Sequence, residues 1–171
     1  FAMSISISTP VDNISPIIDT QRLSLFLIQN RIFSPVSGTT PDFVAETTNV
    51  GGSAPAKYVT RPVTLENEAT ALDVRLTASV QSTSSVKVFY RTTSADDTRK
   101  LGDVAWRAFN TDGTADSVPE PSKDDNDFKE QKFTVSGLEP FSAFSLKIVL
   151  TGTISSYPPL IKDMRGIALA V

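Results

Sequence analysis

The chain has 171 residues, a formal net charge of −3, one tryptophan, and neither cysteine nor histidine. Without Cys and His, the sequence excludes disulfide frameworks, Cys/His zinc sites and Ser–His or Cys–His catalytic dyads. The acidic balance argues against a nucleic-acid partner, and no apolar stretch is long enough for a membrane span. The length fits one domain, with or without an arm.

Residues 4–56 carry few charges and many Pro and Gly residues, which predicts an extended N-terminal arm. Residues 1–3 are interpreted as a tag remnant, because Met stands third. One stretch of the arm is apolar on both faces when extended, which indicates burial on both faces. It predicts a central core strand, an interface strand against a neighbouring subunit, or a short helix from Asp19. The candidate interface residues are Ile17, Ile18, Leu23, Leu25, Phe26, Leu27 and Ile28.

Residues 57–171 predict a β-sandwich domain, which begins with a β-rich segment at 58–65. Pro62 lies inside this segment and indicates an edge strand or a bulge, because proline donates no backbone hydrogen bond. The polar residues 66–70 then predict a turn.

Residues 72–80 alternate apolar and polar side chains more strictly than any other part of the chain, which predicts a strand with one buried face. A second strand is predicted at 86–91. The two are separated by the polar residues 81–84, and this spacing predicts an antiparallel hairpin.

A long polar connection spans residues 93–127. Trp106 is the large aromatic residue within it, and we expect it to pack as an anchor that holds the connection down. Charge is concentrated here, because the range from Asp96 to Glu130 holds ten acids and five bases, a local balance of −5.

Strands are predicted at 128–135, 143–151 and 160–171, and no segment has the pattern of a long amphipathic helix. Charges at Lys162 to Arg165 indicate an exposed segment, a subunit contact, or an ion pair with another strand. Strands joined by polar turns predict an all-β fold, an antiparallel β-sandwich of jelly-roll type.

The acidic connection holds the candidate metal ligands. Asn110, Asp112 and Asp116 surround a glycine in an oxygen-rich loop that resembles a calcium loop but fails the EF-hand spacing. Further oxygens are available from Asp124, Asp125 and Asp127. Ordinary solvated loop charge is the alternative interpretation, so calcium is the one cofactor considered.

Carboxylates are the remaining candidates for catalysis, and glycosidases use a pair of them. Glu66, Glu68 and Glu139 are the residues considered, with solvated turns as the favoured interpretation. Exposed aromatic rings bind sugars by stacking, and the pattern places Phe89 on a face with charged neighbours, which favours its exposure. The candidate rings are Trp106, Tyr90, Tyr157 and Phe89.

Several short segments, or words, of the sequence resemble a domain of uncharacterised function in virion structural proteins of T4-like phages of marine cyanobacteria. The resemblance covers residues 57–171 and, more weakly, 15–32. The words are YVTRPVTL at 58–65, VKVFYR at 86–91, DVAW at 103–106, DFKEQKFTV at 127–135, LEPFSAFSLKIVLTGT at 138–153 and PLIKDMRGIALA at 159–170.

This resemblance implies a piece of a phage tail, baseplate or fibre, clipped from a longer chain and assembled in the cytoplasm of the infected bacterium. It carries no catalytic motif. The expected partners are other virion proteins or copies of the chain itself, in a homo-oligomer. The alternative is a carbohydrate-binding module, with or without calcium, that uses Trp106 and the acidic loop to bind a host glycan.

Overall fold

A computed structural model describes the backbone of residues 14–19, 24–29, 35–37, 40–41, 45–154 and 157–170, and the side chains of the last two ranges. Its regular elements in the described residues are β-strands and one short 3-10 turn, η1 (Leu101–Asp103). The strands are β1 (Ile14–Asp19), β2 (Ser24–Gln29), β3 (Pro35–Ser37), β4 (Thr40–Pro41), β5 (Lys57–Val59), β6 (Val63–Ala69), β7 (Ala71–Ser79), β8 (Ser84–Thr93), β9 (Arg107–Ala108), β10 (Lys129–Val135), β11 (Phe141–Gly152) and β12 (Leu160–Leu169).

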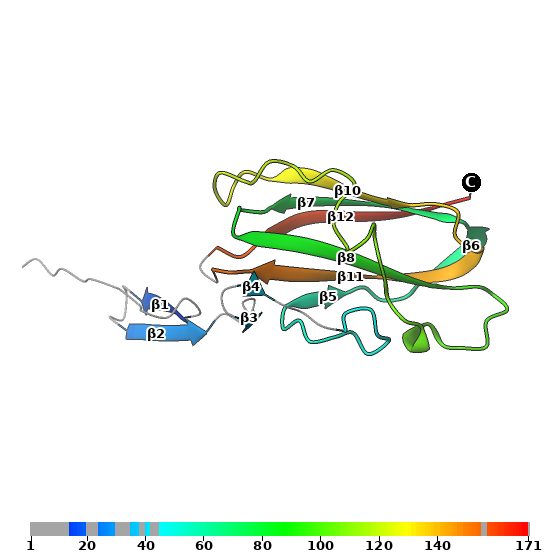
Figure 1. Cartoon of the computed structure of the whole chain (residues 1–171), viewed down its shortest axis with the longest axis horizontal. Helices are drawn as coiled ribbons and strands as arrows, with labels where there is room; N and C mark the ends of the chain where they lie inside the picture. Colours follow the sequence, from blue (N-terminus) through cyan, green and yellow to red (C-terminus); the bar gives the residue numbers. More distant parts are fainter. Residues whose placement is uncertain are drawn as a thin grey trace, which may run out of the picture.

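Two antiparallel sheets form the body of the molecule (Figure 1). The five-stranded sheet has the order β5-β11-β8-β9, and β6 pairs along β11 beyond β5. The three-stranded sheet has the order β10-β7-β12. From β6 to β7, from β7 to β8 and from β9 through β12, the chain alternates between the sheets. This winding confirms the predicted all-β, jelly-roll-like sandwich.

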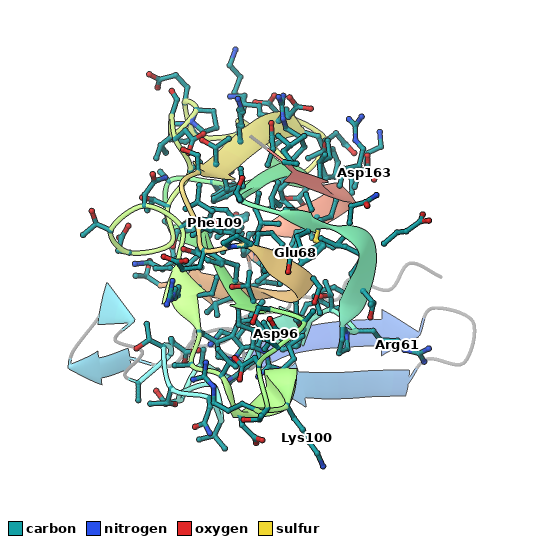
Figure 2. All side chains as sticks on the ribbon, turned by 90° about the vertical axis from the view of Figure 1, so that its right-hand side faces the viewer. Arg61, Glu68, Asp96, Lys100, Phe109 and Asp163 are labelled. Atoms are coloured by element: carbon teal, nitrogen blue, oxygen red, sulfur yellow. The ribbon has the colours of Figure 1, made fainter. Side chains whose placement is uncertain are left out.

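The hydrophobic core lies between the sheets and follows the predicted alternation. Leu72, Val74 and Leu76 of β7 are buried there, since every second residue of a strand faces the same side. Phe109, which follows β9, is fully buried, and its ring lies 6.0 Å from that of Phe133. Figure 2 shows Phe109 among the interior side chains, so the long polar connection contributes part of the core.

The predicted hairpin of β7 and β8 is wrong, because these strands belong to different sheets. β7 pairs with β10 and β12, whereas β8 pairs with β9 and β11. The short polar turn therefore crosses the sandwich instead of joining neighbours in one sheet. Both kinds of turn connect strands with one buried face, so alternation and turn length do not distinguish them.

The turn predicted at 66–70 is also wrong, since β6 continues to Ala69. Its polar residues are solvent-exposed on an edge strand, where polarity is not a turn signal. The edge position predicted from Pro62 is confirmed. β5 ends at Val59 and β6 begins at Val63, and both pair with β11 alone among the described strands.

β1 and β2 form an antiparallel hairpin in a two-stranded sheet of their own. The strand predicted in the doubly apolar stretch is therefore present as Ser24–Gln29, and it is not part of either sandwich sheet. Asp19 ends β1 and starts no helix among the described residues. Leu23 lies outside the described residues, and for the other candidate interface residues only the backbone is described.

Candidate functional site

A buried lysine lies on the outer face of the five-stranded sheet. Lys147 of β11 is 1% exposed, and its Nζ is 3.0 Å from Glu46 Oε2. The same ammonium donates to the Glu46 carbonyl and lies over the rings of Phe89 and Trp106, 4.7 and 5.2 Å from their centroids. An ion pair and two aromatic faces thus compensate for the loss of water around this charge.

The loop of residues 45–56, here called the Glu46 loop, covers this lysine. The Ala54 amide donates to Glu46 Oε1 at 2.7 Å, and Lys57 donates to the Gly52 carbonyl at 2.9 Å. Gly52 has a φ of +58°, and a Cβ there would lie 2.6 Å from Glu46 Cα. The glycine therefore allows the loop to fold closely around its own glutamate.

Trp106 joins the Glu46 loop to the long connection. Its ring is 4% exposed, the Arg91 guanidinium carbon lies 4.2 Å from the ring centroid, and its backbone amide donates to Thr47 at 2.8 Å. The predicted anchor role is confirmed. A ring covered in this way is not available for sugar stacking, and Phe89, which was expected to be exposed, is buried against Lys147.

Burial lowers the pKa of Lys147, and the hydrogen bond and charge of Glu46 oppose this shift. The nearby cations Lys57 and Arg91 lower it further. The carboxylate of Glu46 is therefore the group that holds Lys147 in its charged form.

A cavity of about 570 Å³ opens beside this cluster, over β8 and β11. Phe89 and Val149 line it together with the ion pair of Lys87 and Asp112, whose Nζ and Oδ2 are 3.0 Å apart. Hydroxyl side chains make up much of the remaining wall. These are Thr47, Ser82, Thr83, Ser84, Ser85, Thr151 and Thr153. Such a groove offers hydrogen bonds to a polar ligand and lacks a Ser–His or Cys–His pair for catalysis.

The predicted calcium ligands bond to the protein itself. Asp112 Oδ1 accepts from the Thr114 hydroxyl at 2.8 Å, and Asp116 Oδ2 accepts from the Thr134 hydroxyl at 2.7 Å. Asn110 Nδ2 donates to the Thr114 carbonyl at 2.8 Å and to Asp116 Oδ1 at 3.3 Å. Among the described residues, no group of three His, Cys, Asp or Glu could hold a metal ion. Calcium binding stays a prediction.

These bonds lower the pKa of both carboxyls. For Asp112 the causes are the hydrogen bonds from Thr114 and then Lys87. For Asp116, burial is the largest single influence and would raise the pKa, but the bonds from Thr134 and Asn110 together outweigh it. The ionised carboxylates therefore hold the loop in place.

The carboxylates considered for catalysis lie in solvent. Glu66 and Glu68 are exposed on β6, and Glu139 is exposed before β11. None of the three lines the groove over β8 and β11.

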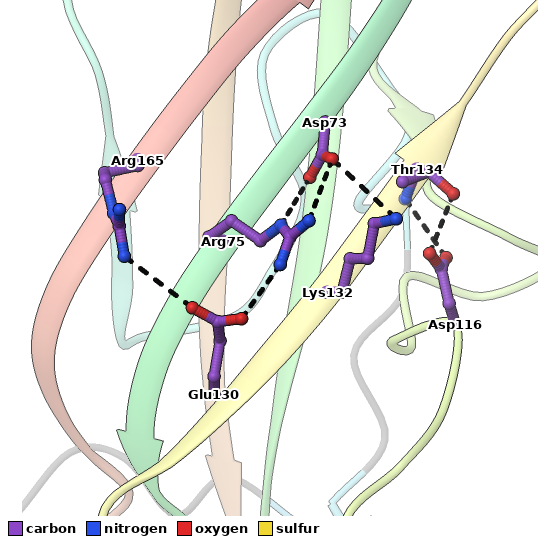
Figure 3. A network of polar contacts seen from close by, with 7 residues as sticks. All are labelled: Asp73, Arg75, Asp116, Glu130, Lys132, Thr134 and Arg165. Carbon is purple, nitrogen blue, oxygen red and sulfur yellow. Dashed lines mark hydrogen bonds and ion pairs between the residues drawn. The ribbon is translucent and has the colours of Figure 1, made fainter.

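Charged side chains tie together the outer face of the three-stranded sheet (Figure 3). Arg75 of β7 pairs with Asp73 and with Glu130 of β10, each at 2.9 Å. Arg165 of β12 reaches Glu130 at 3.6 Å and Asp163 at 3.7 Å. The expected ion pair between this segment and another strand is thus present. Beyond Arg165, the outer face of β12 becomes apolar.

One side of the sandwich is incomplete. Tyr58 of β5 lies opposite Ile148 in the sheet, and Val63 of β6 lies opposite Phe144. Side chains opposite each other in an antiparallel pair share a face, and Ile148 and Phe144 are in the core. Tyr58 and Val63 therefore face inward, yet they are 57% and 41% exposed. The facing three-stranded sheet does not extend far enough to cover them.

β12 borders this gap and has an unpaired side, since among the described strands it pairs with β7 alone. Its first half carries a register shift between Ile161 and Asp163 and several charges, which are features that block unwanted strand pairing. Its second half, Gly166–Leu169, has no charge, and Ile167 and Leu169 are 45% and 42% exposed. We call β12, Tyr58 and Val63 together the open edge.

Glu46, Lys147, Tyr58 and Val63 were not among the functional residues predicted from the sequence, whereas the charged segment Lys162 to Arg165 of β12 was considered as a subunit contact. Lys147 occupies a polar position in an alternating strand, which is the pattern of an exposed residue. Tyr58 and Val63 lie in the segment that Pro62 marks as an edge strand, but Pro62 does not indicate whether their side chains are covered. Whether their inward face is covered depends on the other sheet.

No family model matches the chain, and no curated protein matches it significantly. Across its described residues, the structure also contains no helix with the length and apolar character needed to cross a membrane.

Proposed function

We propose that this chain is a non-enzymatic structural module of a tailed-phage virion, which assembles with copies of itself or with other virion proteins. The sequence resemblance described above supports the virion assignment. The open edge supports assembly, because inward-facing apolar side chains at an incomplete sheet are normally covered in the functional state.

The observation that carries this proposal is the exposure of Tyr58 and Val63 on the inner face of the five-stranded sheet. An isolated sandwich gains nothing from leaving these side chains in water, because each buried apolar group stabilises the fold. A protein partner that extends the three-stranded sheet would cover both.

Size-exclusion chromatography with light scattering on the full chain tests the proposal. We expect an oligomer whose population increases with protein concentration. A strict monomer at every concentration, which also captures no partner from purified virion proteins, would contradict it.

A second candidate function, glycan binding, is favoured by the hydroxyl-lined groove over β8 and β11. The site would use Lys87 and Asp112 rather than the buried Trp106. A glycan array tests it, with Lys87→Ala expected to weaken binding and Lys132→Ala, on the other sheet, as the matched control. Loss of binding with a chelator would support the predicted calcium loop, and no binding across a broad array would exclude this candidate.

A further inference from the structure

The open edge has the geometry of a vacant strand position. A jelly roll has eight strands in two sheets. Here β5 and β6 share one position beside β11, so the strands from β5 to β12 fill four positions in one sheet and three in the other. The missing position lies beside β12, above Tyr58 and Val63.

The winding of the chain indicates where the missing strand belongs in the sequence. The chain crosses to the other sheet after β6, again after β7, and at each step from β9 to β12. A strand that precedes β5 would by the same alternation belong to the three-stranded sheet, next to β12. The residues that precede β5 are those of the N-terminal arm.

The vacancy also specifies the chemistry of its occupant. On the inner face, a new strand would cover Tyr58 and Val63; on the outer face, it would lie beside Ile167 and Leu169. The occupant therefore needs apolar side chains on both faces. In the arm, β2 (Ser24–Gln29) has this pattern, because Leu25 and Leu27 alternate with Phe26 and Ile28.

In this structure β2 pairs with β1 and not with β12. The hairpin lies beyond the end of the sandwich in Figure 1. A two-stranded hairpin alone is marginally stable in water. The chain thus presents a donor strand and an acceptor edge that are separate from each other, which is the arrangement that leads to exchange between copies.

We propose that β2 of one copy pairs with Gly166–Leu169 of β12 in a second copy and completes its three-stranded sheet. This inference rests on the proposed assembly function and specifies its partner. If each copy also receives β2 from the other, the exchange gives a closed two-fold dimer, whereas one-way transfer from copy to copy gives rings or open chains.

Cross-linking tests the pairing directly, because the chain has no cysteine of its own. Full-length Leu27→Cys and Ile167→Cys variants with different tags are co-expressed and treated with a short thiol-specific cross-linker. We expect a cross-linked pair that carries both tags. Val118→Cys, at an exposed loop position, replaces Ile167→Cys as the matched control and should give none.

A second measurement uses Ile167→Lys/Leu169→Lys, two substitutions on the exposed outer face that leave the core intact. We expect a folded monomer, with the fluorescence of buried Trp106 unchanged, whereas Val50→Lys/Val118→Lys should keep the wild-type oligomer. If the wild-type chain is an oligomer but the edge variant is one too and the mixed cross-link is absent, this inference is overturned and the assembly proposal stands. An intramolecular cross-link in Leu27→Cys/Ile167→Cys, with none between chains, would place the strand in its own chain and overturn exchange between copies. If the wild-type chain is monomeric and the cysteine variants give neither cross-link, this inference is overturned. The assembly proposal is overturned as well if the monomeric chain also captures no partner from purified virion proteins.

Discussion

Replacing Glu46 by Gln tests whether Lys147 is held as a buried cation. The substitution keeps the size of the side chain but removes the carboxylate that lies 3.0 Å from Lys147 Nζ. Removing one partner of a buried ion pair costs about 3–5 kcal/mol. Lys147 keeps its bond to the Glu46 carbonyl and its contacts with two aromatic rings. We therefore expect the lower end of the range, about 3 kcal/mol.

For a chain of this size, such a loss corresponds to a decrease of about 6–12 °C in Tm. Urea unfolding, followed by tryptophan fluorescence, measures the loss in free energy of unfolding, since the single tryptophan lies in the same cluster. Glu130→Gln is the matched control, because Glu130 takes part in ion pairs on the exposed face and should change stability little.

The effect should also depend on pH. Because burial lowers the pKa of folded Lys147, the unfolded chain binds more protons between the folded and the ordinary pKa, and stability rises with pH in that interval. Glu46→Gln should lower the pKa of folded Lys147 further, so the stability of the variant should begin to rise at a lower pH than that of the wild type. The stability difference from wild type should therefore narrow as the pH rises from neutral toward the ordinary pKa of lysine. Equal stability of the variant and wild type throughout this range would refute the buried cation.

Four further substitutions test the core, the loops and the acid response. Phe109→Ala should destabilise the fold by about 3–5 kcal/mol in urea unfolding, because it empties a fully buried site; a loss below about 1 kcal/mol would mean that the connection does not contribute to the core. Gly137→Ala should cost about 1 kcal/mol for its left-handed backbone, and Gly52→Ala should cost more in the same assay because its Cβ would also meet Glu46; equal costs would contradict the close approach. The lowered pKa of Asp116 stabilises the fold above the ordinary pKa of the carboxyl, and this contribution is lost as the pH falls through the folded pKa. Asp116→Asn should therefore make Tm fall less steeply as the pH decreases into the acidic range. If the fall in Tm is the same as in the wild type, other groups cause the loss of stability in acid.

Local patterns predicted most of the strands of the sandwich. The alternation in β7 and the apolar face of β11 predict which side chains point into the core, because every second side chain of a strand lies on the same face. Trp106 was predicted as an anchor for the same kind of local reason, since a large aromatic ring in a polar connection has little to gain from water.

The pairing of strands was not accessible in this way. The turn between β7 and β8 was predicted as a hairpin and instead crosses between the sheets. Backbone hydrogen-bonding groups are nearly identical at every residue, so they do not specify the strand with which they pair. The choice between neighbours in one sheet and neighbours across the core depends on distant strands such as β10 and β11.

The candidate sites could not be predicted fully from the sequence either, because they too depend on which distant segments come together. The amino-acid sequence determined the composition that excludes Cys and His chemistry, the strand periodicity of the sandwich and the doubly apolar character of residues 23–28. The tertiary structure decided that Lys147 is buried while Tyr58 and Val63 are exposed, the reverse of their local polarity. Burial is a property of what covers a residue. The Glu46 loop covers one face of the five-stranded sheet, and the shorter sheet leaves part of its other face uncovered.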